Sequence, residues 1–131
     1  TNPFSNKRFE QAKNNITSLL EVIKTGDLVE FVKIVESEAL TLHSMMMTSN
    51  PYFLLMKPNT ISIIEKIWEF RKETGIQACF TLDAGPNIHL LYPNKNKNEV
   101  RSFIESELMQ FTVNNTVIHD VVGNGPEKLD L

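Results

Sequence analysis

The sequence predicts an α+β fold in which a helical hairpin precedes a ferredoxin-like antiparallel sheet with helices packed on one face. Two observations lead to this prediction. Apolar residues recur every three or four positions in four segments, and shorter runs rich in apolar and β-branched residues lie among the later ones. Clusters of glycine, proline and asparagine separate these segments. The length of 131 residues suits one compact domain.

Two helices are predicted at the start of the chain. Residues 5–24 carry apolar side chains at helical spacing. Ser5 can cap the start of this helix, and Gly26 suits the left-handed conformation that ends many helices. Asp27 then opens a capping box, and a second helix runs toward Pro51, which disfavours helix in the residue before it. Because the connection is short, we expect an antiparallel hairpin.

The middle of the chain predicts one helix and a β-hairpin. Residues 52–56 are apolar and are interpreted as either a strand or a buried loop. A third helix is expected over residues 61–74, with Gly75 at its end. Residues 76–82 are apolar and too short for a helix, which predicts a central strand. Turn residues follow, and a second strand is expected over residues 88–92.

The last third of the chain predicts a helix, a strand and a tail. Four apolar residues at helical spacing predict the fourth helix: Val100, Phe103, Ile104 and Leu108. Residues 116–122 are rich in valine and predict a last strand, and residues 123–131 are expected to form a mobile tail. The chain begins at Thr1 without methionine, and a helix opens almost at once. We therefore expect residues 1–131 to be a single domain taken from a longer protein.

Composition and charge exclude several classes of function. The formal net charge is −3 and the sequence contains no basic stripe, so a nucleic-acid partner is not expected. Cys79 is the only cysteine, which excludes an internal disulfide and a cysteine-based zinc cluster. It lies in an apolar run and is interpreted as a small buried hydrophobe. No apolar run approaches the roughly 20 residues that span a bilayer, and we expect a cytoplasmic protein without membrane contact.

Asp83 is the residue most suggestive of chemistry. It ends an apolar run, where a carboxylate is costly unless it is partnered or functional. Ala84 and Gly85 follow it and carry little side-chain bulk, so a ligand could approach the backbone closely. The competing interpretation is structural, because aspartate often caps its own turn through backbone N–H groups. The residue pattern alone favours the structural interpretation and leaves both open.

A resemblance to a known family bears on this choice. The segment Thr-Leu-Asp-Ala-Gly-Pro-Asn, residues 81–87, resembles the Phe-Asp-Ala-Gly-Pro-Asn segment of diphosphomevalonate decarboxylases. His43 and Pro51 resemble the family's histidine-containing helix end and the bend after it. Residues 63–75 resemble the helix between that bend and the aspartate strand, so the likeness runs over about residues 9–108. Leu82 replaces a common phenylalanine, and an aspartate of the bend has no counterpart near Asn50.

The resemblance implies an enzymatic activity and assigns different roles to the two halves of the protein. The family belongs to the superfamily of galactokinase, homoserine kinase and mevalonate kinase, whose members have two halves. The resemblance therefore implies that residues 1–131 are a single C-terminal domain of a longer two-domain enzyme. Its members use ATP and Mg²⁺ to convert 5-diphosphomevalonate to isopentenyl diphosphate, with release of CO2, phosphate and ADP. By resemblance, Asp83 is the catalytic residue and faces the reacting hydroxyl, while Ala84 and Gly85 bind substrate. The sequence contains no phosphate loop, so ATP and Mg²⁺ are expected on the absent N-terminal half. No metal ligand is assigned to this chain, and the isolated chain is expected to be inactive.

Two alternatives remain at this point. The first is a related mevalonate or phosphomevalonate kinase, although those kinases usually carry a glycine-rich stretch where this chain has Asp83 and a single glycine. The second is a non-catalytic α+β binding module. His43, His89 and His119 show no metal-ligand spacing. His43 is interpreted as structural, and His89 as facing either a cleft or solvent. Family members are commonly homodimers, so a homodimer is also expected.

Overall fold

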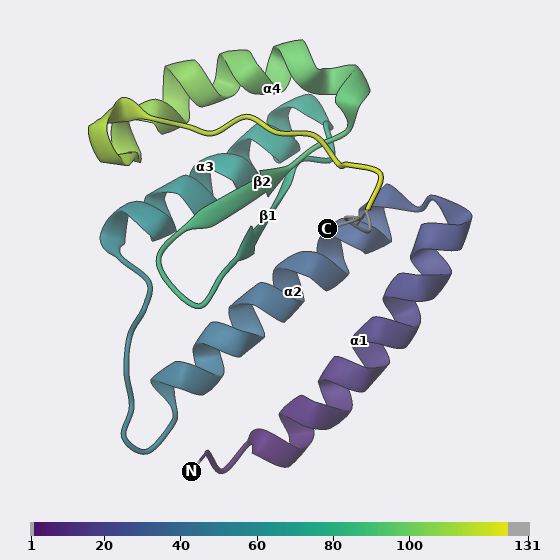
Figure 1. Cartoon of the computed structure of the whole chain (residues 1–131), viewed down its shortest axis with the longest axis vertical. Helices are drawn as coiled ribbons and strands as arrows, with labels where there is room; N and C mark the ends of the chain where they lie inside the picture. The colour runs from purple at the N-terminus through teal and green to yellow at the C-terminus, as the bar shows by residue number, and fades with distance from the viewer. Residues whose placement is uncertain (1, 126–131) are drawn as a thin grey trace, which may run out of the picture.

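The structure is a computed structural model that describes residues 2–125, and it confirms the α+β class. Helices α1, Ser5–Thr25, and α2, Leu28–Met47, form the predicted antiparallel hairpin (Figure 1). Gly26 ends α1 at φ 70° and ψ 22°, the left-handed region that glycine enters without a Cβ clash. The Asp27 side chain accepts a hydrogen bond from the Glu30 amide at 3.2 Å and so caps α2 as predicted.

The predicted N-cap of α1 is wrong. Ser5 is the first helical residue, and no side chain caps the helix. Asn2 fixes its start instead, since the Asn2 side chain accepts from the Phe4 amide at 2.7 Å and donates to the Met45 carbonyl at 2.6 Å. This contact ties the start of α1 to the end of α2, and a local sequence pattern gives no sign of it.

Helix α3, Pro58–Thr74, starts three residues before the predicted position. Pro58 is its first residue, where the missing N–H costs nothing because the first amides of a helix have no partner within it. Gly75 ends α3 at φ 72°, as predicted. Residues 52–56, which we interpreted as a strand or a loop, have no strand structure and connect α2 to α3.

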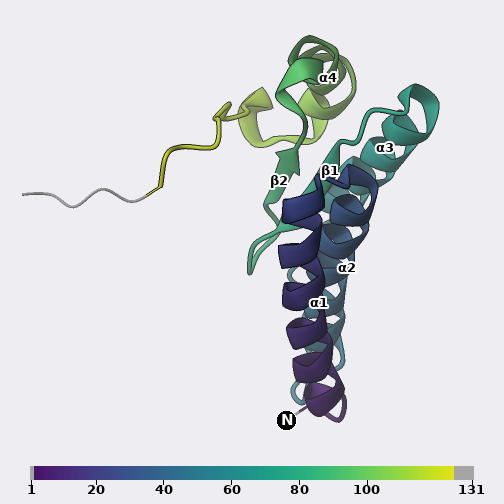
Figure 2. The same cartoon turned by 90° about the vertical axis from the view of Figure 1, so that its right-hand side faces the viewer.

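The sheet is a two-stranded antiparallel hairpin among the described residues. Strand β1, Cys79–Leu82, pairs with β2, Ile88–Leu91, in the register Cys79↔Leu91 and Leu82↔Ile88. Both strands lie within the predicted segments but are shorter. α2 lies alongside β1, and α1 lies outside α2 as an outer layer (Figures 1 and 2).

The C-terminal region departs from the prediction. Helix α4, Lys97–Phe103, continues through a wider turn at Ile104–Leu108 and two short 3-10 turns to Asn115. The predicted strand over residues 116–122 is wrong, because this segment has no ladder partner. Ile118 is 94% exposed and Val122 is 99% exposed, so their β propensity finds no surface to pack on. Of the predicted tail, residues 123–125 are exposed, and residues 126–131 lie outside the described part.

The core lies between α2, α3, β1 and the helical run that begins with α4. Its buried apolar side chains are Ala39, Ile64, Ile67, Phe80, Leu82, Val100, Phe103, Ile104 and Leu108. Phe70 stacks on Phe103 with ring centroids 4.2 Å apart, which joins α3 to α4. α1 contributes one buried residue, Arg8, so the hairpin of strands is positioned by α2 and α3.

Candidate functional site

The loop of residues 83–87, here called the Asp83 loop, joins β1 to β2. The Asp83 carboxylate accepts the Gly85 amide N–H on Oδ1 at 2.8 Å and the Asn87 side-chain amide on Oδ2 at 3.3 Å. This is the turn-capping geometry of the structural interpretation. The carboxylate nevertheless stays 42% exposed, and its two oxygens offer about four lone-pair positions. Two positions therefore remain for a ligand, and capping and binding are compatible.

Gly85 allows the loop to close tightly on its own carboxylate. A Cβ placed on Gly85 would lie 3.3 Å from Asp83 Oδ1, which is closer than most such contacts. Ala84 is exposed and Gly85 is half-buried, and both follow Asp83 directly in the loop. Their small size leaves the approach to Asp83 open.

Two buried polar side chains hold the backbone of the Asp83 loop. His43 of α2 is 1% exposed, and its Nε2 lies 3.0 Å from the Asp83 carbonyl oxygen. Thr60 of α3 is 3% exposed, and its hydroxyl donates to the Pro86 carbonyl at 2.9 Å. The prediction that His43 is structural agrees with this burial, but its partner was not foreseen.

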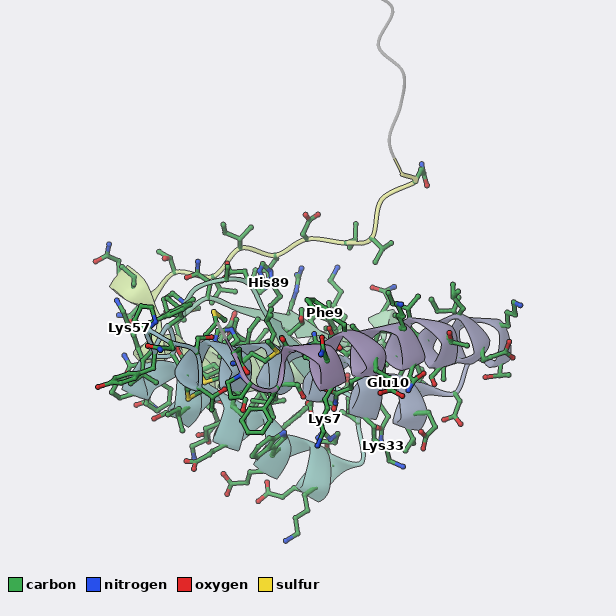
Figure 3. The ribbon with its side chains drawn as sticks, turned by 90° about the horizontal axis from the view of Figure 1, so that it is seen from below. Lys7, Phe9, Glu10, Lys33, Lys57 and His89 are labelled. Atoms are coloured by element: carbon green, nitrogen blue, oxygen red, sulfur yellow. The ribbon has the colours of Figure 1, made fainter. Side chains whose placement is uncertain are left out.

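His89 lies beside the carboxylate on the exposed face of the hairpin. It pairs with Thr81 in the register, and its Nε2 is 3.9 Å from Asp83 Oδ2, which is beyond hydrogen-bond distance. The side chain is 59% exposed. His89 and Phe9 of α1 project toward the same side of the molecule, whereas Lys7 projects toward the other (Figure 3). The face around Asp83 is open, since the carboxylate is 42% exposed and Ala84 beside it is also exposed. A 440 Å³ hollow between α1 and α2 does not include Asp83.

A buried ionic cluster supports the start of β1. Arg71 donates to both Glu36 oxygens at 2.7 and 3.0 Å and to the Ala78 carbonyl at 2.9 Å. The Trp68 indole N–H also donates to Glu36, at 3.0 Å. The cluster joins α2, α3 and the residue before β1, so it fixes the strand that carries Asp83 at its end.

Sequence reasoning missed Glu36 and Thr60 as buried polar residues, and it did not give the partner of His43. The spacing of residues along α2 does indicate that Glu36 and His43 are buried. The buried face of α2 consists of positions four, three and four residues apart: Val32, Glu36, Ala39 and His43. A carboxylate and an imidazole in such a stripe indicate side chains with partners across the core.

Other chemistry is limited in the described part of the chain. Cys79 is 1% exposed, and burial raises the pKa of its thiol to about 11, with the nearby Glu36 carboxylate adding to the effect. It is the buried hydrophobe that the sequence predicted, not a nucleophile. Residues 2–125 contain no group of three or more histidine, cysteine or acidic side chains placed to hold a metal ion. None of the described helices is long and apolar enough to cross a membrane.

Fold and site together define the class: an α+β domain whose strand hairpin presents one hydrogen-bonded carboxylate on an open face. The chain belongs to the family of the mevalonate 5-diphosphate decarboxylase C-terminal domain, whose model matches residues 1–128. The match extends beyond the residues 9–108 that carried the resemblance in the sequence.

Individual relatives agree with this assignment. The chain is 28% identical over 99 residues to a diphosphomevalonate decarboxylase of Debaryomyces hansenii, across 75% of this chain and 24% of that protein. The solved mevalonate diphosphate decarboxylase of Legionella pneumophila superimposes with a TM-score of 0.77 at 33% identity, across 82% of this chain and 34% of that one. A complex of MDDEF with MVAPP, AMPPCP and magnesium gives a TM-score of 0.75 at 26% identity, across 80% and 32%. The chain thus spans about a quarter to a third of the length of these relatives.

Proposed function

We propose that this chain is the C-terminal half of an ATP-dependent mevalonate diphosphate decarboxylase and that Asp83 is its catalytic carboxylate. The observation that carries the proposal is the exposed Asp83 carboxylate, oriented by the Gly85 amide at 2.8 Å, within the family's Asp-Ala-Gly-Pro-Asn segment. The relatives that the chain matches are named as this decarboxylase. The open face around Asp83 supports a second half that closes over it.

The proposed reaction has two stages. The terminal phosphoryl group of ATP passes to the tertiary hydroxyl of 5-diphosphomevalonate, and the hydroxyl proton passes to Asp83. The new phosphate then leaves with the electron pair of its C–O bond. The bond to the substrate carboxylate breaks, and its electrons form the double bond of isopentenyl diphosphate as CO2 departs.

Asp83 has a limited but specific part in these stages. A carboxylate is far too weak a base to deprotonate a tertiary alcohol beforehand. Phosphoryl transfer passes through a loose transition state that requires little basicity. Asp83 therefore orients the hydroxyl and accepts its proton late. Once Asp83 has released that proton to water, its restored negative charge stabilises the positive charge that develops on the carbon as phosphate departs. Ala84 and Gly85 leave room for the substrate beside the carboxylate.

We propose that the N-terminal half holds the nucleotide and Mg²⁺. Residues 2–125 contain no group of three or more histidine, cysteine or acidic side chains that could hold a metal ion. The sequence also has no phosphate loop. The complex of MDDEF with AMPPCP and magnesium supports a nucleotide and metal requirement for the whole enzyme.

We further propose a cytoplasmic homodimer. Four exposed apolar residues lie on one face of α1, namely Phe9, Ile16, Leu20 and Ile23. A contiguous apolar stripe of this kind is a common protein-contact surface. Sedimentation of the full-length protein tests the assembly, and a monomer at micromolar concentration would contradict it.

Asp83→Asn in the full-length protein tests the catalytic proposal. With 5-diphosphomevalonate, ATP and Mg²⁺, the unaltered protein is expected to form ADP and CO2 in equal amounts. Asp83→Asn should reduce turnover by about a hundredfold or more, the scale of a lost proton acceptor. Asp120→Asn is the matched control, because Asp120 is an exposed carboxylate outside the Asp83 loop. ADP without CO2 would identify a kinase, and near-normal turnover of Asp83→Asn would exclude a catalytic role for Asp83.

A further inference from the structure

The Asp83 loop is held at both ends by side chains from two different helices. His43 of α2 contacts the Asp83 carbonyl at the start of the loop, at 3.0 Å. Thr60 of α3 contacts the Pro86 carbonyl near its end, at 2.9 Å. The loop is therefore fixed by residues 40 and 26 positions away in sequence, and not by its own turn alone.

Both contacts are specific hydrogen bonds and not incidental packing. A carbonyl oxygen only accepts, so Nε2 of His43 carries the hydrogen and donates it. The Thr60 hydroxyl donates a hydrogen bond to the Pro86 carbonyl and accepts one from the Lys57 amide at 3.3 Å, so it acts as both donor and acceptor. Because the His43 and Thr60 side chains are only 1% and 3% exposed, a donor left without a partner would lower the stability of the folded domain.

The two contacts determine where the Asp83 carboxylate points. Holding the Asp83 and Pro86 carbonyls fixes the peptide planes at both ends of the turn. Between those planes, the Gly85 N–H is aimed at Asp83 Oδ1 at 2.8 Å. If either end moved, the Gly85 amide would turn away from Oδ1, and the 42% exposed carboxylate would keep only its 3.3 Å hydrogen bond from the Asn87 side chain.

We propose that His43 and Thr60 are positioning residues that set the orientation of the Asp83 carboxylate for reaction. The inference rests on the proposed function of Asp83. Neither residue touches the reacting atoms, and each acts through the backbone of the Asp83 loop. An orientation error of about 1 Å at a reacting group can cost about a hundredfold in rate, so the effect of losing one contact falls on turnover and not on ATP binding.

Paired substitutions in the full-length protein test the inference. His43→Leu and Thr60→Val remove the donor while keeping the bulk, and His43→Gln and Thr60→Ser return a donor. Ser62→Ala is the matched control, because the Ser62 hydroxyl bonds only to Pro58 within α3 among the described residues. Folding of each variant is verified by circular dichroism at the assay temperature. Should His43→Leu fail to fold, the Thr60 variants and His43→Gln carry the test.

We expect kcat to fall about tenfold or more in His43→Leu and Thr60→Val, with an unchanged KM for ATP and substantial recovery in His43→Gln and Thr60→Ser. Combined with Asp83→Asn, the same substitutions should cause little further loss, because residues that act as a unit are not additive. Equal loss in both backgrounds would show an effect independent of Asp83 and overturn the inference, as would unchanged kcat.

A second measurement separates this inference from the proposed function. Amide hydrogen exchange of Gly85 in the 131-residue chain reports the loop directly. Faster exchange in His43→Leu and Thr60→Val, but not in Ser62→Ala, supports the positioning role even if the full-length protein releases no CO2. Unchanged exchange in all three overturns it, whatever the activity.

Discussion

Removing Glu36 is expected to destabilise the domain more than removing any exposed carboxylate. Glu36 is 8% exposed and accepts three hydrogen bonds, two from Arg71 and one from the Trp68 indole. Glu36→Leu fills the space but leaves the Arg71 guanidinium with the Ala78 carbonyl as its remaining described partner. The cost therefore comes from an unpaired cation at the edge of the core.

The magnitude follows from burial. Breaking a buried ion pair by removing one partner costs roughly 3–5 kcal/mol. The Arg71 side chain is 22% exposed, so water can solvate part of it, and we expect about 3 kcal/mol for Glu36→Leu. Arg71→Leu leaves the 10% exposed Glu36 side chain without its cation and should cost more, about 4 kcal/mol. The double substitution should cost less than the sum, since no charge is left unpaired.

Urea unfolding at pH 7, followed by circular dichroism, measures these free energies. Trp68 is the sole tryptophan and contacts Glu36, so its fluorescence would change for local reasons as well. Glu69→Gln is the control, because Glu69 is 57% exposed and pairs with Lys66 at 3.4 Å at the surface. It should change stability by less than about 0.5 kcal/mol. Equal effects of Glu36→Leu and Glu69→Gln, or strictly additive effects in the double variant, would refute the reasoning.

Two further predictions concern stability. Burial raises the pKa of the Cys79 thiol from 9.0 to about 11, so this thiol ionises at a lower pH in the unfolded chain than in the folded one. The stability that the buried neutral thiol contributes to the folded chain is therefore lost as pH rises from about 9 to about 11. The unfolding free energy of the unaltered chain should therefore fall relative to Cys79→Ala by up to about 1.4 kcal/mol per pH unit in that range, and parallel pH profiles would contradict this. Asp27→Ala removes the 3.2 Å cap of the Glu30 amide and should cost about 1 kcal/mol in urea unfolding. Asp27→Asn, which keeps an accepting oxygen, should cost little, and equal losses in both variants would exclude the cap as the cause.

Local signals accounted for much of the fold. Gly26 and Gly75 end α1 and α3 where predicted, because the left-handed conformation is a property of single residues. Asp27 caps α2 through an amide three residues away, which sequence spacing is sufficient to show. The β-hairpin followed from two short apolar runs around a Gly-Pro turn, and the segment that identified the family lies in that turn.

Residues 116–122 show where local propensity fails. Valine and isoleucine favour strands only when a neighbouring strand and a packing surface are available. Here the segment has no neighbouring strand among the described residues, and only the half-buried Val117 packs on the core, while Ile118, Val121 and Val122 stay exposed. The predicted N-cap of α1 was wrong for a related reason. The start of the helix depends on a contact with a distant residue, because Asn2 donates to the Met45 carbonyl.

The sequence by itself determined the helices, the glycines that end α1 and α3, the cap of α2, the hairpin and the position of Asp83 after a buried strand. Only the tertiary structure decided that Asp83 stays exposed while capping its own loop, and that His43 and Thr60 hold that loop from two helices. Caps and periodicity depend on residues three or four positions apart. A buried donor, by contrast, is defined by an acceptor tens of residues away, which is set only when the helices pack on the strands.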